Sequence, residues 1–309
     1  MMAPTTEETR LRNVLNKRPV LGEIIRMIPL TGGLTNKNYV LETQQGRFVL
    51  RVGSASSSLL GIDRDRERIN TNLAHDAGIG PAVADSIPEE NMLILRWIEA
   101  RTLHAEDFRT DQRLLVRVAD TMRKLHDAKP FEGIFHFPTL RNKYLDAVRS
   151  SGYFLPDDYL ALESKILELE KWLDRNMEPL VPCNNDLLAE NFLDDGQKIW
   201  IIDYEYSGQN EASFDIGNMC SEMGMSPDHL SLFCNTYWKQ DLPEKIARAR
   251  AWSMIARFGW VLWASIQEAI SPIDFDFRNW GMKKWDSVVP ELTGDTYYQV
   301  LTDLKKYYA

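Results

Sequence analysis

The sequence has few of the residues that build disulfide-bonded or metal-bound domains, and it has no long apolar segment. Its 3 cysteines form no metal-type pair, and an odd number cannot all be disulfide-bonded, which favours reduced thiols in a cytosol. Its 5 histidines lack the spacing of metal ligands, so we expect no histidine metal site. No run approaches the roughly 18 apolar residues of a membrane-spanning helix, and the N-terminal MMAPTTEETRLRN lacks the apolar core of a signal peptide. We therefore expect a cytoplasmic protein without a membrane partner.

The sequence also lacks an excess of positive charge. Its formal net charge is −9, which argues against a nucleic-acid partner, because such a surface would be strongly basic. An acidic chain suits a cationic small molecule better, whereas an anionic ligand would need local basic residues. With 309 residues, 44% hydrophobic and 26% charged, the chain has the composition of a globular protein with room for two lobes. Nothing in the sequence indicates the oligomeric state.

The pattern of apolar residues changes near residue 98. After a helical stretch at 5–16, the N-terminal third alternates strand-like stretches with turn residues and contains one charged helix near 62–69. The strands expected in this part are 24–29, 38–42, 47–52, 82–85 and 92–97. Helical periodicity dominates afterwards, as in 114–125 and 157–176. The sequence thus predicts an α+β chain with an antiparallel five-stranded lobe at 1–98 and a mainly helical lobe at 99–309.

Residues 181–222 hold a group of polar side chains around a short buried strand. Asp186 precedes Asn191 by five residues, and the turn at 194–196 and the apolar run at 199–202 then lead to Asp203. This order predicts a carboxylate and an amide on one loop, near a second carboxylate at the end of a strand. Hard oxygen ligands of this kind suit Mg²⁺. Taken singly, Asp and Asn before a helix are more often caps or turn formers.

Together with Tyr204-Glu205-Tyr206 and the segment FDIGN at 214–218, this stretch resembles the choline/ethanolamine kinase family of protein-kinase-like enzymes, within the aminoglycoside phosphotransferase superfamily. The resemblance covers roughly residues 24–285. It implies a two-lobed kinase-like fold and transfer of the γ-phosphate of ATP to the hydroxyl of choline or a close amino alcohol. It also implies that Asp186 is the catalytic base and that Asn191 and Asp203 hold Mg²⁺.

The chain departs from the family two residues before Asp186. The family has a histidine there that mainly supports the loop, and this chain has Asn184. The exchange leaves open an inactive enzyme. Two other residues are expected to have a structural role. His126 ends a helix in the sequence Leu-His, where the family histidine is structural, and the resemblance implies that Asp215 pins the loop that carries Asp203.

The N-terminal lobe holds the residues expected to bind ATP. The glycine pair in LTGGLTNKNY can be a simple hairpin turn, but the segment resembles the family's ATP loop, with Gly32, Gly33, Thr35 and Asn36 near phosphate. The family places an arginine where Arg51 stands, to neutralise phosphates, with Glu67 as its expected partner and Asp63 and Asp65 as competitors. The helix at 62–69 could instead be only a solvated face. The resemblance places adenine at the hinge near Leu95 and Trp97, although Trp97 could be a core residue.

The C-terminal lobe holds the residues expected to bind the amino alcohol. Five of the 9 tryptophans lie between 252 and 285, and aromatic residues at helical spacing are more often core than cage. A cage would suit a quaternary ammonium, which is held by cation–π contact. By resemblance, the residues facing the acceptor are Tyr206, Glu222, Trp260, Trp263, Phe275 and Trp280. Two rival functions stay open: a kinase of another small alcohol such as thiamine or an aminoglycoside, and a catalytically silent choline-binding protein.

Overall fold

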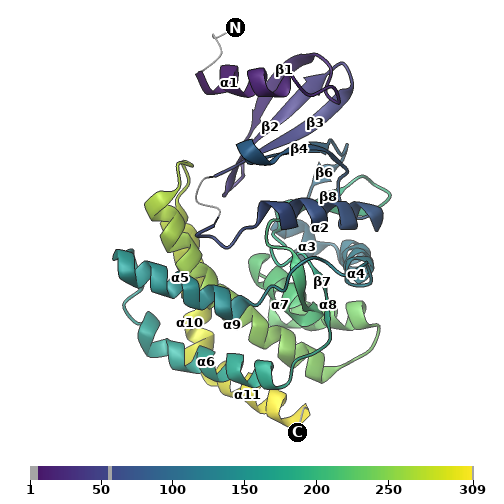
Figure 1. Cartoon of the computed structure of the whole chain (residues 1–309). Helices are drawn as coiled ribbons and strands as arrows, with labels where there is room; N and C mark the ends of the chain where they lie inside the picture. Colours follow the sequence, from purple (N-terminus) through teal and green to yellow (C-terminus); the bar gives the residue numbers. More distant parts are fainter. Residues whose placement is uncertain (1–5, 55–57, 308–309) are drawn as a thin grey trace.

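An antiparallel sheet forms the N-terminal part of the molecule, and a larger helical part follows it (Figure 1). The computed structural model describes residues 6–54 and 58–307. Its sheet has the order β1-β2-β3-β5-β4, in which every neighbouring pair is antiparallel. The strands are β1 (Ile24–Leu30), β2 (Asn36–Thr43), β3 (Gly46–Gly53), β4 (Val83–Ile87) and β5 (Met92–Arg96). The predicted α+β fold class and five-stranded sheet are confirmed.

Helix α1 (Thr6–Leu15) covers part of this sheet. Its Leu11 and Leu15 are fully buried and pack in one apolar cluster with Phe48 and Leu50 of β3. The helix was predicted at 5–16, and residue 5 lies outside the described residues. Burial of one leucine face of α1 accounts for its position against the sheet.

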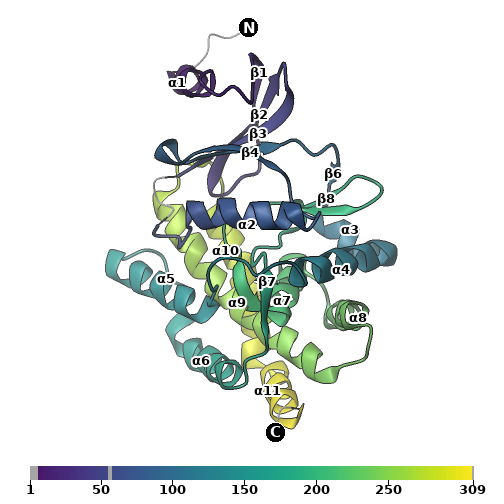
Figure 2. The same cartoon turned by 45° about the vertical axis from the view of Figure 1, so that its right-hand side comes forward.

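Helix α2 (Arg64–Asp76) lies between the sheet and the helical part (Figure 2). Its first turn is capped by Asp63, whose side chain accepts hydrogen bonds from two backbone N–H groups. Glu67, Asn70 and Thr71 are buried on it. The alternative that this segment is only a solvated face is therefore wrong. Its polar residues form an internal surface between the two parts of the chain.

The helical part contains nine helices among the described residues, joined by short strands. The helices are α3 (Ala105–Thr110), α4 (Gln112–His126), α5 (Phe137–Ser151), α6 (Tyr159–Arg175), α7 (Ala212–Glu222), α8 (Pro227–Trp238), α9 (Pro243–Ile270), α10 (Phe277–Thr293) and α11 (Asp295–Tyr307). The short strands are β6 (Arg101–Thr102), β7 (Leu180–Cys183), β8 (Phe192–Asp194), β9 (Ile199–Ile201) and β10 (Gly208–Glu211), and the short 3₁₀ helices are η1 (Pro88–Glu90) and η2 (Ala189–Asn191). Strands β7 and β10 pair with each other, and β6, β8 and β9 form a second small sheet.

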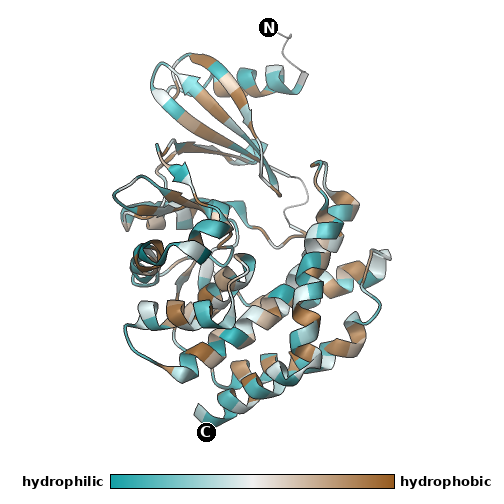
Figure 3. Ribbon diagram, turned by 180° about the vertical axis from the view of Figure 1, so that it is seen from behind, coloured by the Kyte–Doolittle hydropathy of each residue, from teal (hydrophilic) through white to brown (hydrophobic). Residues whose placement is uncertain are grey.

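Helix α9 is the central element of the helical part. It is 28 residues long and packs against α5, α6, α7, α8, α10 and α11. Apolar and polar residues alternate along the surrounding helices, as the view coloured by hydropathy shows (Figure 3). Helix α7 approaches α9 so closely that a Cβ atom at Gly217 would lie 2.2 Å from the carbonyl oxygen of Ala249. Only glycine permits this contact.

We find no helix within residues 6–54 and 58–307 that combines the length and the apolar character needed to cross a membrane.

Candidate active site

A cavity of about 720 Å³ is lined by residues of both parts of the chain. Nearly all the predicted site residues border it; the exceptions are Asn36 and Glu67. At one end its wall consists of the loop after β1 and residues of β3 and β5, and at the other end of aromatic residues from α9 and the segment leading into α10. Asp186 and Asp203 line the space between the two ends. A single cavity therefore brings together the two sets of residues that the sequence assigned to different ligands.

The loop after β7 carries Asp186 and is held by its own polar groups. The Asp186 N–H donates to Asn184 Oδ1 at 3.1 Å, and the Asn191 side-chain nitrogen donates to the Asp186 carbonyl oxygen at 2.7 Å. Asn185 adopts a left-handed conformation with φ of 67°. These contacts fold residues 184–191 into a compact turn, which is why Asp186 and Asn191 lie close together as predicted.

Asn184 joins this loop to the segment that follows β9. It is fully buried, and its side-chain nitrogen donates to the carbonyl oxygen of Asp203 at 2.7 Å while its oxygen accepts from Asp186. Asp203 itself has a left-handed φ of 63°. The residue that departs from the family pattern thus contacts both carboxylate-bearing segments, which is the supporting role expected of the family histidine.

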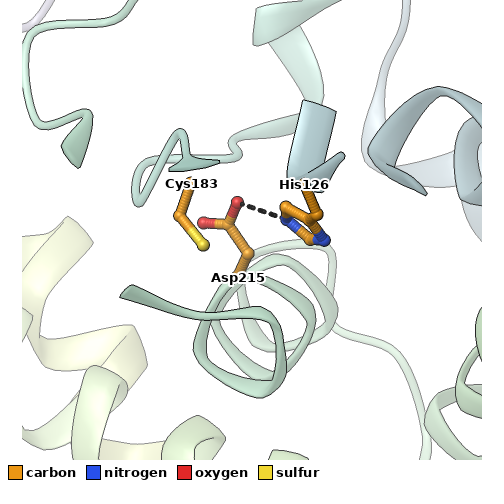
Figure 4. Close-up of side chains that lie close together, drawn as sticks. All are labelled: His126, Cys183 and Asp215. Atoms are coloured by element: carbon orange, nitrogen blue, oxygen red, sulfur yellow. Dashed lines mark hydrogen bonds and ion pairs between the residues drawn. The ribbon is translucent and has the colours of Figure 1, made fainter. Parts of the chain in front are cut away.

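Asp215 anchors the same loop from α7, together with His126 and Cys183 (Figure 4). Its two carboxylate oxygens accept hydrogen bonds from the backbone N–H groups of Asn184, at 3.0 Å, and Asn185, at 2.7 Å. His126 Nε2 lies 3.2 Å from the oxygen that Asn184 contacts. The prediction that Asp215 directly pins the loop carrying Asp203 is wrong, because its contacts are with the loop carrying Asp186.

The cluster of His126, Cys183 and Asp215 has the spacing of a metal site, but hydrogen bonds explain it. Both carboxylate oxygens already accept backbone N–H groups, and His126 Nδ1 lies 2.6 Å from the Tyr237 hydroxyl. Burial raises the pKa of the Cys183 thiol well above its usual value, with further contributions from Asp215, so the sulfur stays protonated. The hydrogen bonds of Asp215 therefore give this cluster a structural role, which is to support the loop.

Arg51 lies in a buried group of three carboxylates. It makes ion pairs with Asp203 at 2.7 Å, Glu67 at 3.2 Å and Glu205 at 3.4 Å. Glu67 is thus the acid of α2 that contacts Arg51, and its competitor Asp63 caps the helix. Arg64 also contacts Glu67 and Glu205, at 2.7 and 3.3 Å. Burial, followed by repulsion from Asp203, raises the pKa of Glu205 to about 7, while Arg51 acts in the opposite direction.

Glu205 and Arg64 were not among the predicted site residues. Glu205 could have been suspected, because it is a carboxylate only two residues after Asp203. Arg64 lies in a charged stretch whose sequence does not show which side chains point into the protein. Glu205 also orders the loop after β1, because Thr35 donates to one of its oxygens at 2.6 Å and Asn36 to the other at 2.8 Å. The side chains of these two residues are therefore turned to Glu205.

The loop after β1 passes the cavity with its two glycines. Gly32 has a φ of 101°, and a Cβ atom at Gly33 would lie 2.7 Å from the carbonyl oxygen of Asn36. Opposite this loop, Leu95 and Trp97 line the cavity. The backbone N–H of Trp97 donates to the Arg47 carbonyl oxygen at 3.1 Å, and the Arg47 guanidinium lies 4.3 Å from the centre of the Trp97 ring. Trp97 is half-buried beneath Arg47, so it is not a core residue.

The far end of the cavity has aromatic walls. The indole nitrogen of Trp263 donates to the Tyr206 hydroxyl at 3.0 Å, and that of Trp260 donates to Asn218 at 2.9 Å. The ring centres of Trp263 and Trp280 are 5.3 Å apart, and those of Trp260 and Trp263 are 6.5 Å apart with perpendicular planes. Phe275 is 40% exposed at the rim. These contacts fix the orientation of the rings that line this end.

Other aromatic residues of the same region belong to the core. Phe258 stacks on Tyr159 with ring centres 4.0 Å apart, Trp285 stacks on the same tyrosine at 5.6 Å, and Trp252 donates to Glu211 at 3.0 Å. The core interpretation of the aromatic-rich segment therefore holds for these residues, while the role of the rings that line the cavity stays a prediction. One side of α9 builds the core, and another lines the cavity.

The structure reveals one further residue at the aromatic end, Lys284. Its ammonium group donates to both carboxylate oxygens of Glu222 and lies 3.8 Å from the centre of the Trp280 ring. Glu222 was expected to face the acceptor. In the structure its negative charge is already balanced by Lys284.

Asp186 is subject to the combined field of these groups. Burial, followed by repulsion from Asp203, Glu205 and Glu222, raises the pKa of the Asp186 carboxyl well above its usual value, and Lys284 opposes the shift. A carboxylate with a raised pKa in a cavity, within reach of a ligand, is suited to accept a proton.

Comparison with known proteins gives consistent results. A family model described as choline/ethanolamine kinase matches residues 27–288. Ethanolamine kinase 2 of Homo sapiens is 28% identical over 295 residues, covering 85% of this chain and 75% of the relative. A crystal structure of a choline/ethanolamine kinase family protein from Mesorhizobium loti superposes with a TM-score of 0.83 at 26% identity, covering 97% of this chain and 99% of the other. An aminoglycoside phosphotransferase solved with gentamicin, APH(2″)-IIa, shares the fold at a TM-score of 0.69 and 13% identity, over 94% of this chain and 99% of its own.

Proposed function

This chain belongs to the choline/ethanolamine kinase family, as its motifs indicated, and on that premise we propose that it transfers the γ-phosphate of ATP to the hydroxyl of choline or a close amino alcohol such as ethanolamine. The observation that carries the proposal is the position of Asp186, in one cavity with the Arg51 and Asp203 cluster on one side and the aromatic wall on the other. A phosphoryl donor and an acceptor alcohol need such an arrangement, since they must meet at one base.

ATP binds at the sheet end in this proposal. The glycine pair after β1 lets backbone N–H groups approach phosphate, and Arg51, which lines the cavity, brings positive charge to acidic surroundings. Leu95 and Trp97 flank the adenine. Because the Trp97 N–H is already bonded to Arg47, recognition of the base edge would use other groups of the hinge.

The donor atoms near Asp203 suit Mg²⁺. Asn191 and Asp203 offer an amide and a carboxylate oxygen, and Glu205 adds a second carboxylate. The side-chain nitrogen of Asn191 is used by the Asp186 carbonyl, so its oxygen is the atom left for a ligand. Burial, followed by repulsion from Asp203, raises the pKa of Glu205, and a bound cation would favour its charged form. When bound, Mg²⁺ would neutralise part of the phosphate charge.

Asp186 serves as the general base. Its carboxylate accepts the proton of the acceptor hydroxyl while the hydroxyl oxygen forms a bond to the γ-phosphorus, and the bond between that phosphorus and the bridging oxygen of ADP breaks. Arg51 offsets the charge on the transferred group and on the leaving ADP. Trp260, Trp263 and Tyr206 hold the acceptor so that its hydroxyl points to Asp186.

The test is phosphoryl transfer by the purified protein with ATP and Mg²⁺ against ethanolamine, choline, thiamine and an aminoglycoside, with each product identified by mass spectrometry. We expect phosphoethanolamine or phosphocholine. Asp186→Asn should lower kcat by at least about 100-fold. Asp286→Asn is the matched control, because Asp286 is exposed on α10. Turnover on thiamine or the aminoglycoside alone would favour the sister kinases, and absence of turnover would favour the silent binding protein.

A further inference from the structure

Lys284 and Glu222 form an ion pair at the aromatic end of the cavity. The two side chains are 10% and 5% exposed, so the pair is largely shielded from water. Glu222 ends α7 and Lys284 lies on α10, 62 residues further along the chain. Among the described residues, Lys284 is the one hydrogen-bond partner of the Glu222 carboxylate. The same ammonium group faces the Trp280 ring.

This arrangement reproduces, with a side chain, what an amino alcohol requires of the site. A carboxylate and an aromatic face are the two groups that stabilise a ligand ammonium. Here the chain's own ammonium uses both. A positively charged acceptor must therefore displace Lys284 from Glu222, or bind beside a second positive charge in a cavity that shields the two charges poorly.

The two candidate acceptors differ in what they can offer Glu222. A primary ammonium has three N–H donors, as lysine has, so ethanolamine can replace both hydrogen bonds that Lys284 gives up. The trimethylammonium group of choline has no N–H donor. Choline would leave the two buried carboxylate oxygens without partners, and an unsatisfied buried charged group is costly.

We propose that Lys284 is a tethered cation that competes with the acceptor for Glu222 and Trp280 and so lowers the affinity of the cavity for any cationic acceptor. This inference rests on the proposed function, because it concerns the acceptor end of the same cavity. It predicts that the unmodified protein uses ethanolamine in preference to choline, because only ethanolamine can replace the hydrogen bonds that Lys284 gives up. It also predicts that both acceptors bind more tightly when the charge of Lys284 is removed.

The test compares Lys284→Met with Lys283→Met. The control removes the same charge from the next residue of α10, which is exposed. Initial rates at saturating ATP give kcat and KM for ethanolamine and for choline in each protein. We expect Lys284→Met to lower the KM of each acceptor by at least about 10-fold, because it removes a competitor common to both, and Lys283→Met to leave both values unchanged.

A binding measurement separates this inference from the proposed function. Calorimetry with tetramethylammonium, which has no hydroxyl and cannot be phosphorylated, should give tighter binding to Lys284→Met than to the unmodified protein. That result would support the competing cation even if no acceptor were turned over, whereas missing turnover alone would overturn the proposed function. Lys284→Gln, which keeps an N–H donor but no charge, serves if the methionine variant does not fold and should give intermediate KM values. Unchanged KM values with unchanged tetramethylammonium affinity would overturn the inference.

Discussion

Asp215→Asn tests whether the loop carrying Asp186 depends on its buried anchor. Asp215 is fully buried, and each of its oxygens accepts a backbone N–H group, from Asn184 or Asn185. An asparagine has one acceptor oxygen in place of two, so one of these N–H groups must face another donor. This leaves one buried N–H group unsatisfied, at a cost of about 1–3 kcal/mol, and the remaining bond loses its charged acceptor, at about 1 kcal/mol. We expect a loss of about 2–4 kcal/mol in the free energy of unfolding.

Urea denaturation followed by tryptophan fluorescence measures this loss, with Asp286→Asn as the exposed control, for which a change within about 0.5 kcal/mol is expected. Steady-state kinetics give a second result. Because Asp186 follows directly after the two anchored residues, kcat should fall for every acceptor. A variant as stable as the control would refute the hydrogen-bond reasoning. A destabilised variant with normal kcat would refute the role of Asp215 in positioning Asp186.

Three further predictions concern the cavity. The raised pKa of Asp186 means that its carboxyl group loses its proton only above the usual carboxyl pH range. Because the base must be ionised, kcat/KM should begin to fall at a pH above that range as the pH is lowered. A pH–rate profile that stays flat down to pH ~5 would contradict this. Arg51→Lys replaces a planar guanidinium group, which contacts three carboxylates, by a single ammonium group. The KM for ATP should rise about 10-fold. An unchanged KM for ATP would exclude Arg51 from phosphate binding. Trp263→Ala should raise the acceptor KM about 3- to 30-fold, from the loss of cation–π contact, and equal effects on the KM values of acceptor and ATP would count against the aromatic wall.

The sequence sufficed for the sheet and for the chain segments around the cavity. The strands were predicted to within two residues at each end, because turn residues interrupt short apolar stretches between 24 and 97. Asp186, Asn191 and Asp203 follow one another closely along the chain, so local order and the family resemblance were enough to associate them. Glu67 was expected beside Arg51 and lies there, 3.2 Å away on α2, the helix that follows β3.

The contacts made by distant residues could not be predicted in this way. Lys284 stands in the sequence Gly-Met-Lys-Lys-Trp, and nothing local distinguishes it from the exposed Lys283. The packing of α10 on α9 decides that Lys284 is buried and Lys283 faces solvent. Asp215 was assigned to the wrong loop for the same reason, because its partners Asn184 and Asn185 lie 31 and 30 residues earlier in the chain and are brought to α7 by tertiary packing.

The close packing of α9 has a consequence for how the acceptor end can change over evolution. Trp260 and Trp263 stand on a helix that is buried along most of its length and held by six other helices, so a substitution there disturbs the whole helical part. Phe275 and Lys284 lie on a segment that contacts α9 from outside and reaches the surface. The wall on α9 is therefore hard to change, whereas the contacts with an acceptor can be altered at Phe275 and on α10 with less disturbance of the helical part.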